Sequence, residues 1–334
     1  MNVIGRGLDI GTCFINSATM NENEEVDIKT MRDAFFAIEN SKLTRKMLNN
    51  GKANYLESEG GDQLYICGNE ALNYANIFKK EVRRPLHKGV ISTREPEALA
   101  MIKAIIEMVL GKPTVEKEIC KFSVPADPID ADYNIIYHKN VLRSFVEDAG
   151  FTPDPINEAS AVCYAELAEE NFTGLAISFG AGMVNASLNY MGVSSTEFSV
   201  SRSGDWIDEN AAKAIGDRIS RITAIKEKGI DILNPQSREE KTIAIFYEDF
   251  IGYVVKCFKQ KLIETSELPE FPEPISVVLA GGTSMAKNFD KVFANELKKI
   301  RLPFEVKEVR TASDKLFAVA KGCLFASIAE QEEE

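Results

Sequence analysis

One pattern of strand, glycine turn and strand occurs twice in this 334-residue chain, about half the chain length apart. The first copy lies at residues 3–20 and the second at 175–191. Aligning the two copies places Gly11 on Gly180, with apolar residues on either side of each turn. The repeat predicts two lobes of similar fold, each beginning with a β-hairpin.

Glycine turns of this kind are suited to binding anions. Glycine adopts backbone conformations that expose consecutive N–H groups, and such groups form a concave anion site. Two turns that face each other would hold a polyphosphate from both sides, although each alone also fits an ordinary tight hairpin. Asp9, at the end of the first strand, would repel phosphate unless Mg²⁺ lies between them. The Thr12 hydroxyl adds a donor to the same turn.

A third glycine signal comes late in the chain. The apolar strand Ile275–Ala280 ends in Gly281 and Gly282 and is followed by a helix. Ligands of open α/β sheets bind outside the carboxyl ends of the strands, and paired glycines let a base or ribose approach the backbone. The GxGxxG and GxxxxGK[ST] fingerprints are both absent, so neither of those nucleotide folds is expected.

Charge and composition exclude several classes of protein. The net charge of −12 disfavours nucleic acid and anionic membrane surfaces as direct partners. No apolar run reaches the roughly 18 residues of a membrane helix, and we expect a cytoplasmic protein without an intrinsic membrane segment. The six cysteines form no CxxC pair, and His87 and His138 lie far apart, so neither disulfides nor a zinc site is expected. A GxSxG motif, typical of serine hydrolases, is also missing.

The remaining elements follow from apolar periodicity and from helix start and stop signals. The acidic residues from 130 onwards and Gly150 predict a long helix at 130–149, and Asn157 is a candidate cap for a helix at 157–170. Further strands are expected at 26–29, 34–38, 119–124 and 194–201, and further helices at 95–110, 206–215, 218–228, 238–263, 285–300 and 314–329.

Five segments, in order, resemble motifs of the actin-like ATPases, a superfamily that includes actin, heat-shock chaperone ATPases and sugar kinases. They are LDIGT (8–12) and ISFGAGMVN (177–185), similar to the two phosphate motifs; INEASAV (156–162) and FAVAKGCL (317–324), similar to the two connecting motifs; and VLAGGTSM (278–285), similar to the adenosine motif. The resemblance spans nearly the whole chain. Within the superfamily, the chain most resembles prokaryotic actins of the MreB, MamK and ParM type, on the basis of its length and of the segments AVAKG and PLHKGVI (85–91).

The resemblance implies an α/β protein with two lobes of actin-like (ribonuclease H-like) fold around a nucleotide cleft. The first lobe would comprise residues 1–150 and 315–334, with a small outer subdomain at about 30–85. The second lobe would comprise 151–314. Only about a dozen residues separate two of its helices, so its outer subdomain, at about 217–242, is expected to be reduced.

The resemblance also implies a binding site for ATP or GTP with Mg²⁺. Asp9 would be the metal ligand and a catalytic residue, and Lys226 and Glu227 match the actin pair that contacts the nucleoside. The other expected nucleotide-binding residues are Gly11, Thr12, Cys13, Ser178, Gly180, Ala181, Gly182, Gly204, Asp205, Gly281, Gly282 and Thr283.

Two departures from the family pattern bear on hydrolysis. Ser178 stands where the family usually has an aspartate that orders Mg²⁺ and its waters. The segment after Val124-Pro125 is longer than usual, which leaves the residue that orients the attacking water open: counting back from Gly150 gives His138, and counting forward from Pro125 gives Asp132. His138 also fits a solvent-facing helix position. These changes argue against fast hydrolysis more than against binding.

Three functions fit this sequence. The first is an actin homologue that polymerises head to tail and hydrolyses ATP slowly. The second is a monomeric ATPase switch of the chaperone or assembly-accessory type. The third is a small-molecule kinase, which needs an acceptor site with a general base that no motif here supplies. In the first reading the partners are nucleotide and other copies of this chain.

Overall fold

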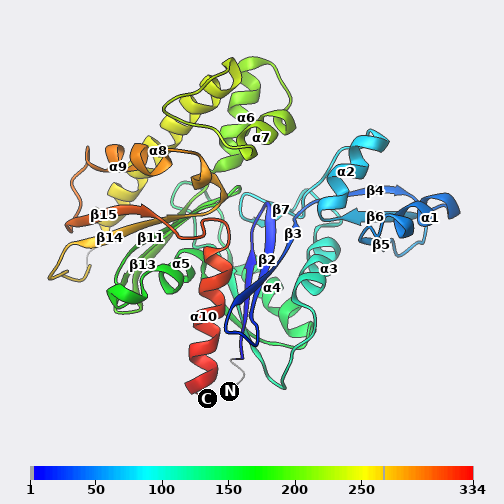
Figure 1. Ribbon diagram of the computed structural model, residues 1–334, viewed down its shortest axis with the longest axis horizontal. Coiled ribbons are helices and arrows are strands. Elements are labelled where there is room, and N and C mark those ends of the chain that lie inside the picture. Colours follow the sequence, from blue (N-terminus) through cyan, green and yellow to red (C-terminus); the bar gives the residue numbers. More distant parts are fainter. Residues whose placement is uncertain (1–3, 266–267, 334) are drawn as a thin grey trace.

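The computed structural model describes residues 4–265 and 268–333, and two five-stranded sheets organise them (Figure 1). The first has the order β10 (Thr152–Asn157), β9 (Ile119–Val124), β1 (Arg6–Ile10), β2 (Phe14–Met20) and β3 (Val26–Arg32). The second has the order β15 (Val306–Thr311), β14 (Ile275–Ala280), β11 (Gly174–Phe179), β12 (Val184–Tyr190) and β13 (Val193–Val200). In each, the central strand pairs antiparallel with its hairpin partner and parallel with a strand from later in the chain. The two lobes therefore share one topology, as the repeat predicts.

The two central hairpins also share a register. Asp9 lies opposite Asn16 in the first hairpin, and Ser178 lies opposite Asn185 in the second. Every residue of β1 and β11 is buried. The strand β11 is nearly apolar throughout, as is typical of a strand covered on both faces. The strand β1 contains Arg6 and Asp9 and was recognisable from the glycine turn that follows it.

Helices cover both faces of each sheet. The helices α3 (Ala98–Leu110) and α4 (Ile136–Asp148) pack on the first lobe, while α6 (Gly204–Ile215), α7 (Ile219–Glu227), α8 (Arg238–Glu264) and α9 (Phe289–Leu297) pack on the second. Between the sheets lie α5 (Glu158–Glu166) and the C-terminal helix α10 (Ala318–Glu333), which cross closely (Figure 1). A Cβ at Gly322 would lie 1.7 Å from the carbonyl oxygen of Ala161, so glycine is required at this crossing.

The outer parts of the lobes are unequal. The first lobe carries β4 (Phe35–Glu39), α1 (Lys42–Asn50), β5 (Tyr55–Glu57), β6 (Gln63–Cys67) and α2 (Asn69–Phe78), with a three-stranded sheet of order β4-β6-β5. A short hairpin of β7 (Leu86–His87) and β8 (Val90–Ile91) follows. In the second lobe residues 228–237, all of them described, form no named strand and contribute one isolated bridge, Asp231 to Lys287. The predicted reduction of this subdomain is confirmed.

Several expected elements have other bounds. The helix predicted at 130–149 begins at Ile136, because residues 126–130 cross to the second lobe. The helix predicted at 157–170 ends at Glu166, and residues 168–170 form a 3-10 turn. The helix predicted at 285–300 spans Phe289–Leu297, because Asn288 before it is left-handed, with φ of 66°. The strand β10, not predicted, pairs with β9, so the first sheet continues beyond residue 150, where we expected the second lobe to begin.

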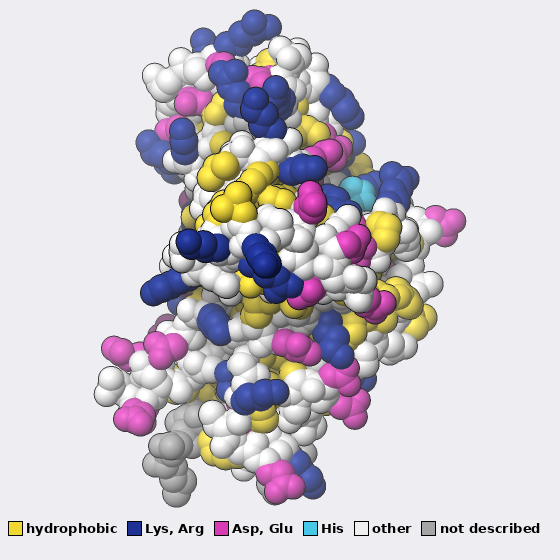
Figure 2. Space-filling model, turned by 90° about the vertical axis from the view of Figure 1, so that its right-hand side faces the viewer, with side chains coloured by type: hydrophobic (Ala, Val, Ile, Leu, Met, Phe, Trp, Pro, Cys, Tyr) yellow, Lys and Arg dark blue, Asp and Glu magenta, His cyan; other side chains and the backbone are white. Residues whose placement is uncertain are grey.

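Charge is unevenly distributed over the side that carries α1 to α3. Figure 2 shows lysine and arginine side chains gathered towards the upper part of this face and acidic side chains towards the lower part. Among the described residues, no helix is both long and apolar enough to cross a membrane.

Candidate functional site

A cavity of about 480 Å³ lies between the two lobes, where both glycine turns meet. Of the residues expected to bind nucleotide or metal, all but one line it: Asp9, Gly11, Thr12, Cys13, Ser178, Gly180, Ala181, Gly182, Asp205, Lys226, Glu227, Gly281, Gly282 and Thr283. Gly204 does not line the cavity but is bonded to residues that do. Its N–H donates to the Gly180 carbonyl at 3.2 Å, and its own carbonyl accepts from the Lys226 ammonium at 2.9 Å.

The two turns have the same closing bond and approach each other closely. The Gly11 N–H donates to the Phe14 carbonyl at 3.0 Å, and the Gly180 N–H donates to the Met183 carbonyl at 2.9 Å. A Cβ at Gly182 would lie only 2.2 Å from the Thr12 hydroxyl oxygen. The close approach of the lobes therefore requires a residue without a side chain at this position, independently of any ligand.

The hairpin of β7 and β8 borders the cavity from the first lobe, beside the two glycine turns. The Gly89 N–H donates to the Thr12 hydroxyl at 3.2 Å, and a Cβ at Gly182 would lie 2.5 Å from the same nitrogen. Gly89 lines the cavity. It belongs to the PLHKGVI segment, which the sequence placed near no particular site.

Two carboxylates lie at the floor of the cavity. Asp9 is buried and accepts from the Asn16 amide at 3.0 Å and the Ser123 hydroxyl at 3.1 Å. Burial raises its pKa to about 6, although both hydrogen bonds favour the charged form. Glu158, the first residue of α5, accepts from the Ser178 hydroxyl at 3.3 Å. Burial, and secondly the nearby charge of Asp9, raises the pKa of Glu158 to about 8.

Sequence reasoning missed Glu158 as a site residue. It lies in INEASAV, directly after Asn157, which caps α5 by accepting from two backbone N–H groups as predicted. This segment was identified only as similar to a connecting motif, although a carboxylate directly after a helix cap at the lobe boundary was the available signal.

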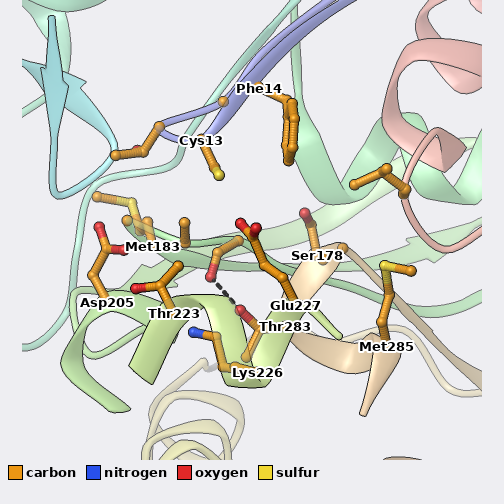
Figure 3. Close-up of a pocket in the computed structure, with 18 of the residues that line it drawn as sticks. Cys13, Phe14, Ser178, Met183, Asp205, Thr223, Lys226, Glu227, Thr283 and Met285 are labelled. Carbon is orange, nitrogen blue, oxygen red and sulfur yellow. Dashed lines mark hydrogen bonds between the residues drawn. The ribbon is translucent and has the colours of Figure 1, made fainter. Parts of the chain in front are cut away.

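Figure 3 shows the cavity, across which Cys13 and Phe14 of the first lobe face Thr223, Lys226, Glu227 and Thr283 of the second. The ammonium of Lys226 lies 2.7 Å from the carboxylate of the buried Asp208. The Thr283 hydroxyl donates to the Gly180 carbonyl at 2.9 Å, which fixes the glycine turn at 281–282 to the one at 180–182. Phe14 and Met285, neither of them expected, also line the cavity.

Two ion pairs cross the cleft. The guanidinium of Arg32 donates both terminal nitrogens to the Glu227 carboxylate, at 3.0 and 3.2 Å, and lies over the Phe14 ring at 4.4 Å. One terminal nitrogen of the Arg84 guanidinium donates to both carboxylate oxygens of Asp205, at 3.1 and 2.9 Å. All four charged residues line the cavity. The arginines carried no sequence signal, because each finds its partner in the other half of the chain.

The two candidates for orienting an attacking water do not line the cavity. His138 is buried on α4, rather than facing solvent, and its Nδ1 accepts from the Ile91 N–H at 3.3 Å. Burial lowers its pKa to about 4, so the ring is neutral near pH 7. Asp132 is exposed before α4 begins. The structure therefore brings neither side chain to the floor formed by Asp9 and Glu158.

Two lobes of one topology, with facing glycine turns and a cavity between them, define an actin-like protein. A family model described as Volactin matches residues 4–327. The chain belongs to the volactin family. No curated protein matches it in a sequence search.

Solved structures with the same fold cover nearly the entire chain. A MamK double helical filament has a TM-score of 0.73 and 17% identity and covers 99% of both chains. MreB5 of Spiroplasma citri bound to AMPPNP has a TM-score of 0.68 and 15% identity, covering 98% of this chain and 96% of its own. The ethanolamine utilization protein EutJ from Carboxydothermus hydrogenoformans has a TM-score of 0.56 and 15% identity, covering 96% and 89%. These similarities confirm the expected actin-like fold.

Proposed function

We propose that this protein binds a nucleoside triphosphate with Mg²⁺ between its lobes and polymerises head to tail into filaments, with slow hydrolysis. The observation that carries the proposal is the pair of facing glycine turns above two enclosed carboxylates. Backbone N–H groups of the turns suit phosphate oxygens, and the cavity extends past Lys226 and Glu227 towards Gly281 and Gly282, with room for a nucleoside.

The floor of the cavity fits a magnesium ion. Asp9 and Glu158 supply oxygen donors, which Mg²⁺ prefers, and it usually binds one or two carboxylates while keeping several waters. Burial raises the pKa of both carboxyl groups, and the charge of Asp9 raises that of Glu158 further; a bound cation would relieve this penalty on the charged forms. Bound there, Mg²⁺ would supply charge neutralisation for the phosphates. The Ser178 hydroxyl, which holds Glu158, would orient that carboxylate.

We expect slow hydrolysis because Ser178 stands where the actin-like family usually has an aspartate. A carboxylate at position 178 would add a third anionic group beside the metal waters, whereas Ser178 contributes only a hydroxyl. Phosphoryl transfer depends almost entirely on positioning and electrostatic stabilisation, and losing one such contact lowers rates by roughly 10²–10³. We expect turnover well below one per second.

Polymerisation is supported by the fold shared with MamK, whose structure is described as a double helical filament. Head-to-tail contacts use two different surfaces of each subunit, so they do not close and they generate open filaments. The alternative is a monomeric switch. The two ion pairs across the cleft favour it, because they would form when the lobes close and break when the lobes open.

The test is binding of fluorescent mant-ATP with and without Mg²⁺, followed by negative-stain microscopy of the same samples. We expect Mg²⁺-dependent binding and filaments. The matched variant is Gly282→Arg. A Cβ at this position meets only Leu316, at 3.7 Å, so the protein itself tolerates substitution while the long side chain fills the nucleoside end. Unchanged affinity in this variant would contradict the site assignment.

A further inference from the structure

The segment at 126–130 belongs to the first lobe but is fastened to the second. The Ile129 N–H donates to the Ser199 carbonyl at 3.0 Å, and the Ser199 N–H donates to the Asp127 carbonyl at 3.3 Å. The Ser199 hydroxyl donates to the carbonyl of Ala126 at 2.7 Å. Residues 126–130, here called the strap, thus lie along the outer edge of β13. They account for the extra length of this segment noted in the sequence.

Asp130 ends the strap and makes its strongest contacts. One carboxylate oxygen accepts from the Ser201 N–H at 2.7 Å, and the other accepts from the Tyr253 hydroxyl of α8 at 2.8 Å. Both donors belong to the second lobe. Hydrogen bonds to an ionised acceptor are about twice as strong as neutral ones. Asp130 does not line the nucleotide cavity.

The strap leads to the second phosphate turn through residues 201–205. The Gly204 N–H donates to the Gly180 carbonyl at 3.2 Å, and the Asp205 N–H donates to the Ala181 carbonyl at 2.8 Å. Residues 201–205 are therefore held by the first lobe at one end through Asp130. At the other end they hold the backbone that would contact phosphate.

An aromatic cluster extends the same connection. The guanidinium of Arg202 lies between the ring of Tyr253, at 3.8 Å, and the ring of Trp206, at 4.2 Å. Because Tyr253 also donates to Asp130, a change at the strap alters the surroundings of Trp206, the only tryptophan of the chain.

We propose that Asp130 is a positioning residue for the nucleotide site. By fastening the strap to Ser201 and Tyr253, it fixes residues 201–205 and with them the second phosphate turn at Gly180 and Ala181. The inference rests on the proposed function, since the turn is assigned to phosphate there. It goes further, because it gives Asp130, which lies beside the edge strand β13 and outside the cavity, control over how long the nucleotide stays bound.

The experiment compares Asp130→Ala with Glu248→Ala, which removes an exposed carboxylate from α8. The measured quantities are the dissociation rate of mant-ADP in Mg²⁺, by stopped flow, and the Trp206 emission of the nucleotide-free protein. We expect Asp130→Ala to release nucleotide about tenfold faster, for the loss of two charge-assisted bonds, and to shift the emission. Glu248→Ala should match the parent. Asp130→Asn, which keeps an acceptor for Ser201, should lie between them.

Each outcome decides the matter. A purely structural strap would lower the melting temperature of Asp130→Ala but leave its dissociation rate at the parent value, and that result would overturn the inference. If Asp130→Ala does not fold, Tyr253→Phe removes a single donor and should release nucleotide about threefold faster; an unchanged rate there also overturns it. Absence of mant-ADP binding by the parent would instead contradict the proposed function, while the emission shift would still test the strap.

Discussion

Arg84 and Asp205 lie in different lobes, and one terminal nitrogen of the Arg84 guanidinium donates to both carboxylate oxygens of Asp205, at 2.9 and 3.1 Å. Asp205 lies in the first turn of α6, so its charge is also favoured by the helix N-terminus. Arg32 and Glu227 form the second ion pair across the cleft, in which both terminal guanidinium nitrogens donate. Since both pairs line the cavity, the lobes cannot separate around a nucleotide without breaking them.

Because the two ion pairs join the lobes, we predict that nucleotide release becomes faster when either ion pair is removed. Arg32→Glu should release mant-ADP about two- to fivefold faster, because partly exposed pairs contribute roughly 0.2–1 kcal/mol each and reversal adds repulsion. The double variant Arg32→Glu with Glu227→Arg should return towards the parent rate, measured by stopped flow. If the charge-swapped protein does not recover the parent rate, the ion pair of Arg32 with Glu227 does not govern nucleotide release.

A methyl group at Gly182 should force the two facing glycine turns apart. The Cβ of Gly182→Ala would lie 2.2 Å from the Thr12 hydroxyl and 2.5 Å from the Gly89 nitrogen, far inside van der Waals contact. Overpacking of this kind costs roughly 1–3 kcal/mol, and we expect at least tenfold weaker nucleotide binding by titration calorimetry. Gly252→Ala is the control, because it lies inside α8 and its Cβ meets only Glu296, at 3.9 Å. Equal affinity in both variants would refute the account of the turns.

The enclosed carboxylates make stability fall with rising pH. The raised pKa values, about 6 for Asp9 and about 8 for Glu158, mean that the folded state holds protons which the unfolded state releases. The free energy of unfolding of the nucleotide-free protein should therefore drop between pH 6.5 and 8.5, by on the order of 2 kcal/mol. Urea denaturation across this range measures it.

The control for the pH dependence is Glu158→Gln, which stays neutral. This variant should show a flatter dependence on pH, while Mg²⁺ with nucleotide should reduce the drop in the parent. A Glu158→Gln protein whose stability follows the parent curve throughout would show that Glu158 does not titrate in this range.

His138 is expected to matter for stability. His138→Ala removes the acceptor of the buried Ile91 N–H and leaves a void, which together should cost about 2–4 kcal/mol in thermal unfolding. Asp132→Ala, at an exposed site, should stay within about 0.5 kcal/mol of the parent. Slower phosphate release at unchanged nucleotide affinity, in either variant, would instead support the water-orienting role proposed from the sequence.

The buried, doubly covered parts of the fold were the predictable ones. The strands β9 and β14 have the predicted bounds, because each is a short apolar run with a clear breaker after it. The edge strands β10 and β15 escaped notice: β10 contains two prolines, and neither alternates or reads as a continuous apolar run. The acidic start at 130 resembled a helix N-terminus, but Asp130 bonds to the other lobe instead, and tertiary contacts decided the boundary.

In the candidate site, too, some residues could be predicted from the sequence and others could not. Groups carried by glycine turns could be predicted, since the local sequence determines the turn. The partners of Arg32 and Arg84, and the placement of Gly89 against Thr12, depend on how two distant segments meet. A single sequence contains no signal for such contacts between segments that are far apart in the chain.

The proposed function requires that nucleotide binding between the lobes drive polymerisation. The direct measurement is the critical concentration, by pelleting and light scattering, with Mg²⁺-ATP, with Mg²⁺-ADP and without nucleotide, at 20 and 150 mM salt. A ligand shifts only states that it binds unequally, so ATP should lower the critical concentration by favouring the closed subunit. Salt should lower it further, because subunits of net charge −12 repel one another less when the Debye length shortens. A monomer by sedimentation in every condition, at tens of micromolar protein, would contradict the account and favour the monomeric switch.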